Sequence, residues 1–332
     1  MELSIIIFLL GGLFLGWSLG ANDAANVFGT AVGTRMMRFR TAAIICSIFV
    51  ILGAIISGSG TTETLGKLGA INALPGAFAA CVAAGLSVYL MTRFGLPVST
   101  TQAIVGAIVG WNIYTGSSTN TKILITILST WILCPIIAGL IAMFFYVLAK
   151  KFIHSSKLHI LRLDAYTRAA LILAGAFGAY SLGANNIANV MGVFVPISPF
   201  TDINVMNIFI FSSKEQLFLL GGIAIAIGVF TYSRRVMFTV GNDLSKMSPV
   251  AAFIVVISHS IVLFLFASQG ISNFLQSINL PSIPLVPVSS SQAVVGAVIG
   301  IGLLKGGKEV RWSVAGKISL GWFTLPLIAA FI

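Results

Sequence analysis

Long apolar stretches dominate this chain of 332 residues and restrict its fold more than any other feature. About 20 consecutive apolar residues are needed for a helix to cross the hydrocarbon core of a membrane. The chain is 58% hydrophobic and only 8% charged, a balance that the surface of a water-soluble protein of this length could not carry. We therefore predict an all-α polytopic membrane protein. The expected spans are residues 3–32, 41–58, 74–92, 121–149, 165–195, 216–232, 249–268 and 313–331, with shorter apolar stretches at 97–112 and 287–303.

Two sequence motifs each occur twice. The stretch SLGANDAANV at 18–27 matches SLGANNIANV at 181–190 in eight of ten positions, and PVSTTQAIVGAIVG at 97–110 matches PVSSSQAVVGAVIG at 287–300 in nine of fourteen. The chain is therefore composed of two related halves. Each half contains five apolar segments, an odd number, so the second half must enter the membrane from the opposite side. This is an inverted-topology repeat, a common construction in secondary transporters.

A third and weaker pair supports the same division. A tryptophan lies four residues before a proline in the last span of each half. The second half is 27 residues longer between its two motifs, and we expect the extra residues in the loops at 196–214 and 269–286. The residues of the third pair are Trp131 and Pro135 in the first half and Trp322 and Pro326 in the second.

Basic residues indicate the orientation, because Lys and Arg accumulate in cytoplasmic loops. With the N-terminus outside, sixteen Lys and Arg residues lie inside and three lie outside, which accounts for most of the net charge of +11 without a nucleic-acid partner. Both termini are then outside. The N-terminal stretch lacks the basic flank and cleavage site of a secretory signal, so we expect it to be retained as a span. The chain divides into a first repeat at 1–149, a basic cytoplasmic connector at 150–164 and a second repeat at 165–332. The sixteen inside residues are Arg35, Arg38, Arg40, Arg93, Lys150, Lys151, Lys157, Arg162, Arg168, Arg234, Arg235, Lys246, Lys305, Lys308, Arg311 and Lys317, and the three outside are Lys67, Lys122 and Lys214.

The Asn-rich motif places polar side chains where hydrocarbon is expected. Its first copy lies in a segment of about 30 residues, which would be about 45 Å long as one helix, so we predict a broken helix at the motif. Such a break is tolerated only where it is buried or lines a water-filled cavity. Amide and carboxylate oxygens beside freed carbonyls suit a small hard cation such as Na⁺, whereas simple helix packing is the alternative. The predicted Na⁺ ligands are Asn22, Asp23, Asn26, Asn185, Asn186 and Asn189.

The second motif is typical of the start of a half-helix. A proline fixes the backbone, a serine or threonine caps the helix, and the free N–H groups at its positive end attract anions. Two such ends, brought together by the pseudo-two-fold axis, would hold one tetrahedral oxyanion near the middle of the membrane. Ordinary capping is the alternative for either copy alone. The segments at 97–112 and 287–303 can be separate crossings or arms of re-entrant hairpins. The predicted oxyanion ligands are Ser99, Thr100, Thr101, Gln102, Ser289, Ser290, Ser291 and Gln292.

A few other polar residues are weaker candidates. Glu63 and Asp243 occupy corresponding places before the third span of each half and are candidate gate or accessory ion-site carboxylates, with a solvated position as the alternative. His259 is alone in its span, and we expect a packed, hydrogen-bonded residue there in preference to a proton relay. The three cysteines, Cys46, Cys81 and Cys134, have neither metal nor redox spacing and are expected to serve packing.

The two repeated motifs resemble those of the inorganic phosphate transporter (PiT) family, which includes bacterial phosphate permeases and animal sodium-phosphate symporters. GANDAAN resembles the family's repeated GAND signature, and LPVSTTQAIVGAIVG resembles its second repeated motif. The tract LSKMSPVAAF before the second-half motif also fits the pattern. The resemblance covers essentially the whole chain, and two motif types that are each duplicated make it specific.

The resemblance implies an inverted repeat with a transport core and a scaffold that moves orthophosphate with Na⁺ or H⁺. Carried over by position, Asp23, Asn26, Asn186 and Asn189 would serve the cation sites, and residues 99–102 and 289–292 would hold phosphate. The sequence departs from the family where many members carry protonatable residues, and this favours Na⁺ over H⁺ coupling. The departures are Asn186 in place of Asp, Gln102 and Gln292 in place of His, and Val50 and Val256 in place of Glu.

From these residues we expect a secondary active transporter, not an enzyme, that imports inorganic phosphate with Na⁺ by alternating access. The alternatives are transport of sulfate or another tetrahedral oxyanion, coupling to H⁺, a passive anion channel, and an intramembrane hydrolase, which would need a base beside its nucleophile. We expect a multi-pass protein of the plasma membrane (the cell inner membrane) with no cofactor other than Na⁺ as the coupling ion. Its partners would be phosphate, Na⁺ and the lipid bilayer. A homodimer is compatible with a scaffold, although no residue demonstrates one.

Overall fold

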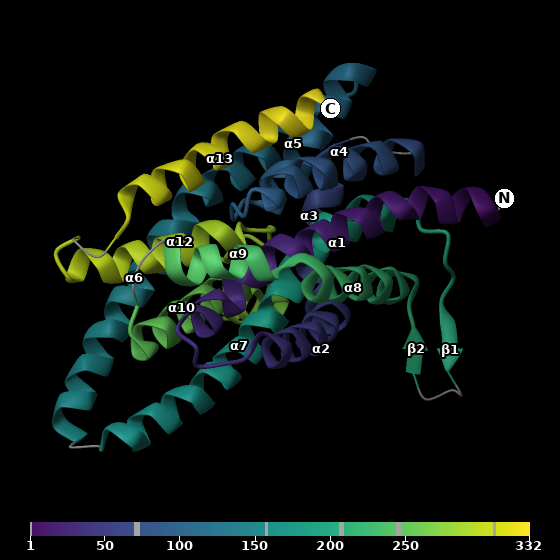
Figure 1. Cartoon of the computed structure of the whole chain (residues 1–332). Coiled ribbons are helices and arrows are strands. Elements are labelled where there is room, and N and C mark those ends of the chain that lie inside the picture. Colours follow the sequence, from purple (N-terminus) through teal and green to yellow (C-terminus); the bar gives the residue numbers. More distant parts are fainter. Residues whose placement is uncertain (1, 70–73, 157–158, 206–208, 244–246, 308–309) are drawn as a thin grey trace.

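The computed structural model describes residues 2–69, 74–156, 159–205, 209–243, 247–307 and 310–332, nearly all of them in helices (Figure 1). The first half of the chain forms six helices, which are α1 (Glu2–Gly33), α2 (Phe39–Ser57), α3 (Ser59–Gly66), α4 (Leu74–Arg93), α5 (Thr100–Thr115) and α6 (Thr121–Ser156). The second half forms α7 (Ile160–Met191), the 3₁₀-helix η1 (Gly192–Ile197), β1 (Ile203–Val205), β2 (Phe209–Phe211), α8 (Ser213–Tyr232), α9 (Arg234–Phe238), the π-helical turn η2 (Thr239–Asp243), α10 (Pro249–Ala267), α11 (Gln269–Ser277), α12 (Ser290–Leu304) and α13 (Trp312–Phe331).

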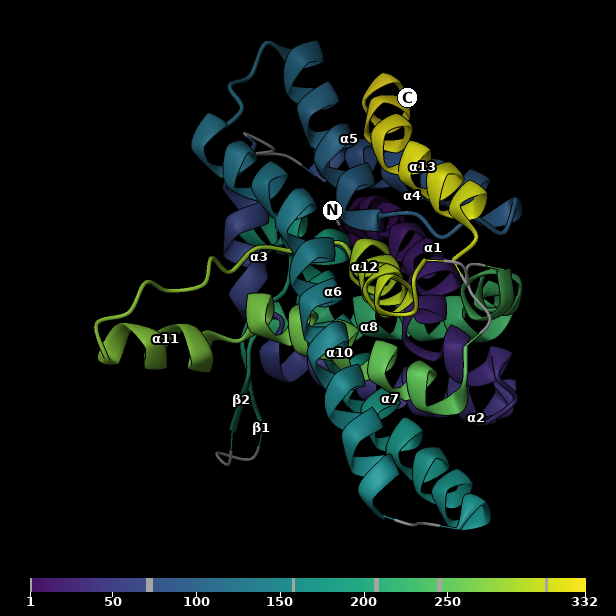
Figure 2. The same ribbon diagram turned by 90° about the vertical axis from the view of Figure 1, so that its left-hand side faces the viewer.

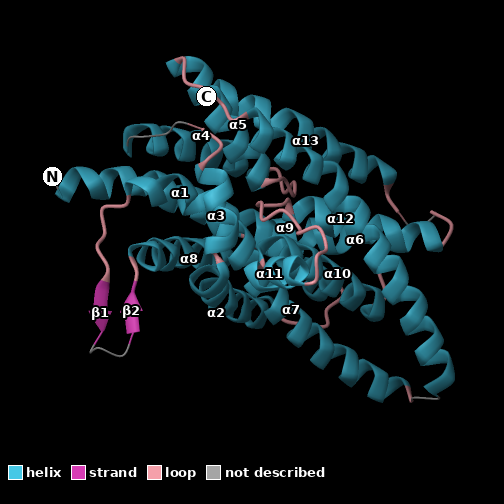
Figure 3. Ribbon diagram, turned by 180° about the vertical axis from the view of Figure 1, so that it is seen from behind, coloured by secondary structure: helices cyan, strands magenta, loops and turns pink. Residues whose placement is uncertain are grey.

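The predicted membrane fold is confirmed. Among the described residues, eight helices are long and apolar enough to cross a membrane, namely α1, α2, α4, α6, α7, α8, α10 and α13. The helices α5 and α12 are shorter, at 16 and 15 residues. The extra residues of the second half form the antiparallel pair β1–β2, in which Ile203 faces Phe211, and the helix α11. The two strands project from the helices in Figure 3.

The helices repeat their packing in inverted form. The long helix α1 packs between α4 and α8, and its equivalent α7 packs between α10 and α2. The two halves therefore use corresponding helices for corresponding contacts, as an inverted repeat requires. This arrangement places both copies of the Asn-rich motif in the interior of the bundle, the first in the second half of α1 and the second in the last turns of α7.

The predicted helix break at the Asn-rich motif is wrong. Both α1 and α7 are continuous through it, over 32 residues each. The motif contains no proline, so no backbone donor is missing, and its amide side chains bond to neighbouring segments and leave the backbone of their own helix intact. A straight helix of 32 residues is about 48 Å long, so its excess length must be taken up by tilt or by projection beyond the membrane core.

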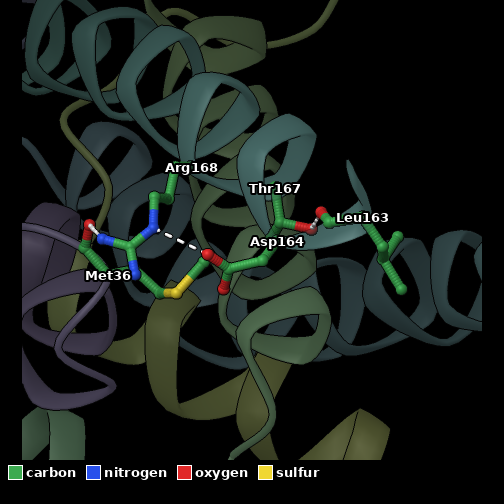
Figure 4. A network of polar contacts seen from close by, with 5 residues as sticks. All are labelled: Met36, Leu163, Asp164, Thr167 and Arg168. Atoms are coloured by element: carbon green, nitrogen blue, oxygen red, sulfur yellow. Dashed lines mark hydrogen bonds and ion pairs between the residues drawn. The ribbon is translucent and has the colours of Figure 1, made fainter. Parts of the chain in front are cut away.

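Basic segments from distant parts of the sequence meet at one end of the bundle. Arg168 at the start of α7 donates from Nη1 to the Met36 carbonyl at 3.1 Å and from Nε to Asp164 Oδ2 at 2.9 Å (Figure 4). Arg235 donates to the Arg93 carbonyl at 2.7 Å. The last turns of α6 and the first turns of α7 lie at this end, and the two ends of the chain lie at the other (Figure 1). The structure thus separates a basic end from the end that carries both termini.

The half-helices pack against the opposite half of the chain. A Cβ atom added at Gly296 of α12 would lie 2.2 Å from the Pro135 carbonyl oxygen of α6, and one at Gly106 of α5 would lie 2.2 Å from the Pro326 carbonyl oxygen of α13. In Figure 2, α12 lies beside α6 and α5 beside α13. Each half therefore supplies the last helix against which the other half's half-helix is fixed, and both glycines are needed for this backbone contact.

We predict that Gly296→Ala destabilises the protein by about 1–3 kcal/mol, because the added methyl group would force α12 away from α6. Thermal unfolding in detergent, followed by loss of the monodisperse peak, measures this. The control is Gly316→Ala in α13, where an added Cβ has no atom within 4 Å and the helix propensity of alanine favours the change. Equal unfolding temperatures for the two variants would contradict the close-contact role of Gly296.

Candidate functional site

Both copies of both motifs meet in the interior. All eight residues of the two half-helix motifs and all six of the predicted cation ligands are at most 3% exposed. They come from the second half of α1, from the last turns of α7 and from the first turns of α5 and α12. Because all fourteen side chains are buried, the site is closed to both sides of the molecule.

Asn22 joins α1 to the segment that leads into α5. Its Oδ1 accepts from the Val98 N–H at 2.9 Å, and its Nδ2 donates to Thr92 Oγ1 at 2.8 Å and to the Leu96 carbonyl at 2.9 Å. These bonds satisfy an extended backbone that has no helical partners of its own. In a membrane interior such groups must be paired within the protein.

Asn185 does the same in the second half. Its Oδ1 accepts from the Val288 N–H at 2.9 Å, and its Nδ2 donates to the carbonyls of Leu263 at 3.3 Å and Val286 at 3.5 Å. Asn22 and Asn185 thus hold the starts of α5 and α12 at equivalent places on α1 and α7. Thr92, the side-chain partner of Asn22, is not predictable from the sequence, because a lone threonine in a span has no distinguishing signal.

Asp23 connects α1 directly to the first turn of α5. Its Oδ2 accepts from Thr100 Oγ1 at 3.0 Å, and its Oδ1 accepts from Asn26 Nδ2 at 3.3 Å. No Lys, Arg or His is paired with this buried carboxylate among the described residues. An ionised carboxylate without a countercharge is costly inside a membrane, so the arrangement favours a bound cation beside it.

In the second half, the position equivalent to Asp23 is Asn186, so an amide replaces the carboxylate. Asn189 Nδ2 donates to Asn186 Oδ1 and to Thr101 Oγ1, each at 2.9 Å, and Thr101 Oγ1 in turn donates to the Val288 carbonyl at 3.2 Å. This chain of bonds runs from α7 through α5 to the start of α12. The two half-helix N-termini are thereby brought within a single hydrogen bond of each other.

Both half-helices begin as predicted. Ser99 Oγ accepts from the Gln102 N–H and Ser289 Oγ from the Gln292 N–H, at 3.2 Å each, so both serines are N-caps. The remaining N–H groups of a first helical turn have no intrahelical acceptor. Two positive helix ends this close together are the kind of arrangement that suits an anion.

His259 contacts the second half-helix. Its Nε2 lies 2.9 Å from Ser290 Oγ, and the ring is fully buried in α10. The histidine is packed and hydrogen-bonded, as expected, but no pattern in the sequence indicates that its partner is a residue of the oxyanion motif. Thr100, the equivalent of Ser290, is bonded to Asp23 instead, so the two halves hold these hydroxyl groups by different partners.

Several buried polar atoms of the site have no hydrogen-bond partner within the described residues. Four are oxygens, and these can accept from a protonated ligand or bind a cation. The Asn186 Nδ2 amide is a donor without a partner. Since buried polar groups in proteins are nearly always paired, these atoms indicate a ligand of mixed character. The four oxygens are Asn26 Oδ1, Asn189 Oδ1, Gln102 Oε1 and Gln292 Oε1.

Of the two accessory candidates, Glu63 lies outside the cluster. The Glu63 side chain is 62% exposed and pairs with Lys67 at 3.7 Å. Asp243 ends η2, and its side chain lies outside what the structure describes. The three cysteines are buried and free, as expected of packing residues.

Comparison with known proteins identifies the class to which this arrangement belongs. The model of the phosphate transporter family matches residues 19–166 and 161–332. The chain belongs to the phosphate transporter family. A provisionally named phosphate permease of Methanocaldococcus jannaschii is 30% identical over 334 residues, covering 100% of this chain and 96% of its own, and one of Pyrococcus horikoshii is 28% identical over 403 residues, covering 99% and 95%.

A solved structure extends the likeness to the fold. The structure described as the sodium-dependent phosphate transporter superposes with a TM-score of 0.79 at 25% identity, covering 98% of this chain and 96% of its own. The family model matches this chain twice, once in each half, which agrees with the inverted repeat. The family resemblance carried by the GAND and PVSTTQ motifs is confirmed, and so is the expectation that the protein is a transporter and not an enzyme.

We predict different costs for two neighbouring asparagines of this transporter. Asn22→Ala removes three hydrogen bonds and should lower the free energy of unfolding by about 2–4 kcal/mol, whereas Asn26→Ala removes one and should cost about 1 kcal/mol. Thermal unfolding of the two variants in detergent without substrate compares them directly. If Asn26→Ala were the more destabilising change, the structural role assigned to Asn22 would be wrong.

Proposed function

We propose that this transporter imports inorganic phosphate coupled to Na⁺ by alternating access. The observation that carries the proposal is the meeting of two capped half-helix N-termini from inverted halves beside one buried carboxylate, Asp23. Membership of the phosphate transporter family supports phosphate as the cargo. The neighbour described as sodium-dependent supports Na⁺ as the coupling ion.

Phosphate would be held between the first turns of α5 and α12. The free backbone N–H groups, the hydroxyl groups and the amides of Gln102 and Gln292 are the donors for its oxygens. At neutral pH phosphate also carries at least one proton, which needs an acceptor, and the Asp23 carboxylate lies beside Thr100 at the start of α5. The proposed ligands remain Ser99, Thr100, Thr101, Gln102, Ser289, Ser290, Ser291 and Gln292.

Na⁺ would be held by oxygens of the Asn-rich motifs. Asp23 supplies the charge, and Asn26 Oδ1 and Asn189 Oδ1 are buried oxygens with no other partner in the described structure. Asn22 and Asn185 would contribute by fixing the half-helices beside the ions. In each residue the amide oxygen and the amide nitrogen both bond to the segment that leads into a half-helix. With one carboxylate in the first half and Asn186 at the equivalent place, the two cation positions are not equivalent.

Alternating access is supported by the closure of the site. Its residues are shielded from both ends of the bundle, so phosphate can enter only after a movement between the halves. The basic end, with Arg168, Met36 and Arg235, would face the cytoplasm and both termini the outside. We place the protein in the plasma membrane on the same argument.

The decisive measurement is uptake of labelled phosphate into proteoliposomes with and without an inward Na⁺ gradient. We predict Na⁺-dependent uptake that Asp23→Asn lowers by roughly tenfold or more, as loss of a charged ligand of the cation would. The control is Asp164→Asn, which changes a surface carboxylate paired with Arg168 and should leave uptake unchanged. Uptake driven by a proton gradient alone would favour H⁺ coupling. An internal phosphate concentration that never rises above the equilibrium set by the external phosphate would favour a channel.

Competition tests the choice of oxyanion. We predict that tenfold excess sulfate reduces phosphate uptake by less than about half, because sulfate has no proton to donate to Asp23 and so makes one hydrogen bond fewer than phosphate. The same assay with arsenate, which shares the protonation of phosphate, serves as the positive control for competition. Sulfate that competes as well as arsenate would show that the site recognises only tetrahedral shape and charge.

A further inference from the structure

The third repeated pair of the sequence, Trp131 and Trp322, has a shared and unexplained property. Each indole Nε1 is buried, and neither has a hydrogen-bond partner among the described residues. The two residues are equivalent in the inverted repeat, each four residues before the proline on which a half-helix packs. An unpaired buried donor costs free energy, and the same cost at two equivalent positions points to a shared purpose.

The packing of α12 on α6 fixes the level of Trp131. The closest contacts of Gly296 and Gly300 in α12 are to Pro135 and Gly139 in α6, so the two helices run in parallel and in step. Cys134, the residue before Pro135, also reaches the start of α12, because its Sγ lies 3.5 Å from the Ser289 carbonyl. Trp131 therefore lies at the level of the first turn of α12, where Gln292 precedes Gly296 by four residues.

The other half repeats this register. Gly106 and Gly110 of α5 contact Pro326 and Ala330 of α13, and an added Cβ at Gly321 would lie 3.5 Å from Val98 in the segment leading into α5. By the same count of one turn, Trp322 lies at the level of Gln102. Each tryptophan thus accompanies a glutamine that belongs to the other half of the chain.

The glutamines have the complementary deficiency. Gln292 Oε1 and Gln102 Oε1 are buried acceptors without partners in the described structure, as the two indole N–H groups are buried donors without partners. Side chains on an α-helix lean toward its N-terminus, so in parallel helices both members of each pair lean the same way, toward the site. One donor and one acceptor at the same level, both lacking partners, can satisfy each other.

We propose that Trp131 and Trp322 are positioning residues of the substrate site. When phosphate is bound, the indole N–H of Trp131 donates to Gln292 Oε1 and that of Trp322 donates to Gln102 Oε1. A carboxamide held by its oxygen must present its NH₂ group, not its carbonyl, to the anion. Each half of the chain thereby orients a phosphate ligand of the other half. This inference rests on the proposed phosphate site.

Crossed double-mutant cycles test the pairing through phosphate uptake in proteoliposomes. Trp131→Phe keeps the aromatic ring and should raise KM for phosphate about threefold to tenfold, the size of one hydrogen bond, with the maximal rate within about twofold of wild type. The effect should vanish in a Gln292→Ala background and persist in a Gln102→Ala background, and Trp322→Phe should behave in the reverse manner.

A control variant tests whether any loss of an indole N–H changes KM, and two other results would contradict the proposal. Trp312→Phe changes an exposed indole that donates to the Gly307 carbonyl at 3.2 Å and should leave KM unchanged. Effects of Trp131→Phe that are equal in both glutamine backgrounds would overturn the pairing. If Gln102→Ala and Gln292→Ala themselves leave KM unchanged, the proposed phosphate site is wrong, and this result is distinguishable from failure of the pairing alone.

A measurement on the native tryptophans covers the case in which a variant does not fold. The chain has five tryptophans, so ¹⁵N-tryptophan labelling in detergent gives five indole N–H resonances. Adding phosphate with Na⁺ should move two of them downfield, as new hydrogen bonds do, and only one in Gln292→Ala. Resonances that do not respond to phosphate, or two that still move in Gln292→Ala, would refute the proposal.

Discussion

Backbone groups that are withdrawn from water must find partners inside the protein, and the rest of this structure depends on how that requirement is met at two places. The segments leading into α5 and α12 are extended and buried. Asn22 and Asn185 supply the missing partners, each using both ends of one amide. A half-helix can begin in the interior only because such an amide stands opposite it. The proposed anion site would then be a consequence, since the first N–H groups of α5 and α12 have no helical acceptor.

The two halves share a framework but not a chemistry. The framework residues Asn22 and Asn185 are identical and make equivalent bonds to Val98 and Val288. The residues that contact the hydroxyl groups differ, because Thr100 donates to the Asp23 carboxylate whereas Ser290 is hydrogen-bonded to the imidazole ring of His259. Gene duplication explains the shared part. The difference makes the surroundings of the proposed phosphate site asymmetric.

Much of the fold follows from the sequence, because apolar length and motif duplication are properties that sequence records directly. The spans, the inverted repeat and the two capped half-helices were all predictable, as were the residues that gather at the site. The continuity of α1 was not, since the length of its segment suggested a break and the sequence does not show where Asn22 finds its partners. The contact between His259 and Ser290 joins residues 31 apart on different elements, and no local pattern encodes it.

The exchange of half-helices between the halves limits the movements available for transport. The contacts of Gly106 with Pro326 and of Gly296 with Pro135 bring backbone against backbone, and such close packing cannot slide by a fraction of a residue. The helix pairs α5–α13 and α12–α6 should therefore move as rigid units. The bonds that join these units at the site, from Asn189 to Thr101 and from Thr101 to the Val288 carbonyl, involve rotatable side chains. Opening of the site should break these bonds first. Because both bonds lie between the two half-helix N-termini, their loss would separate the proposed phosphate ligands at the moment of release.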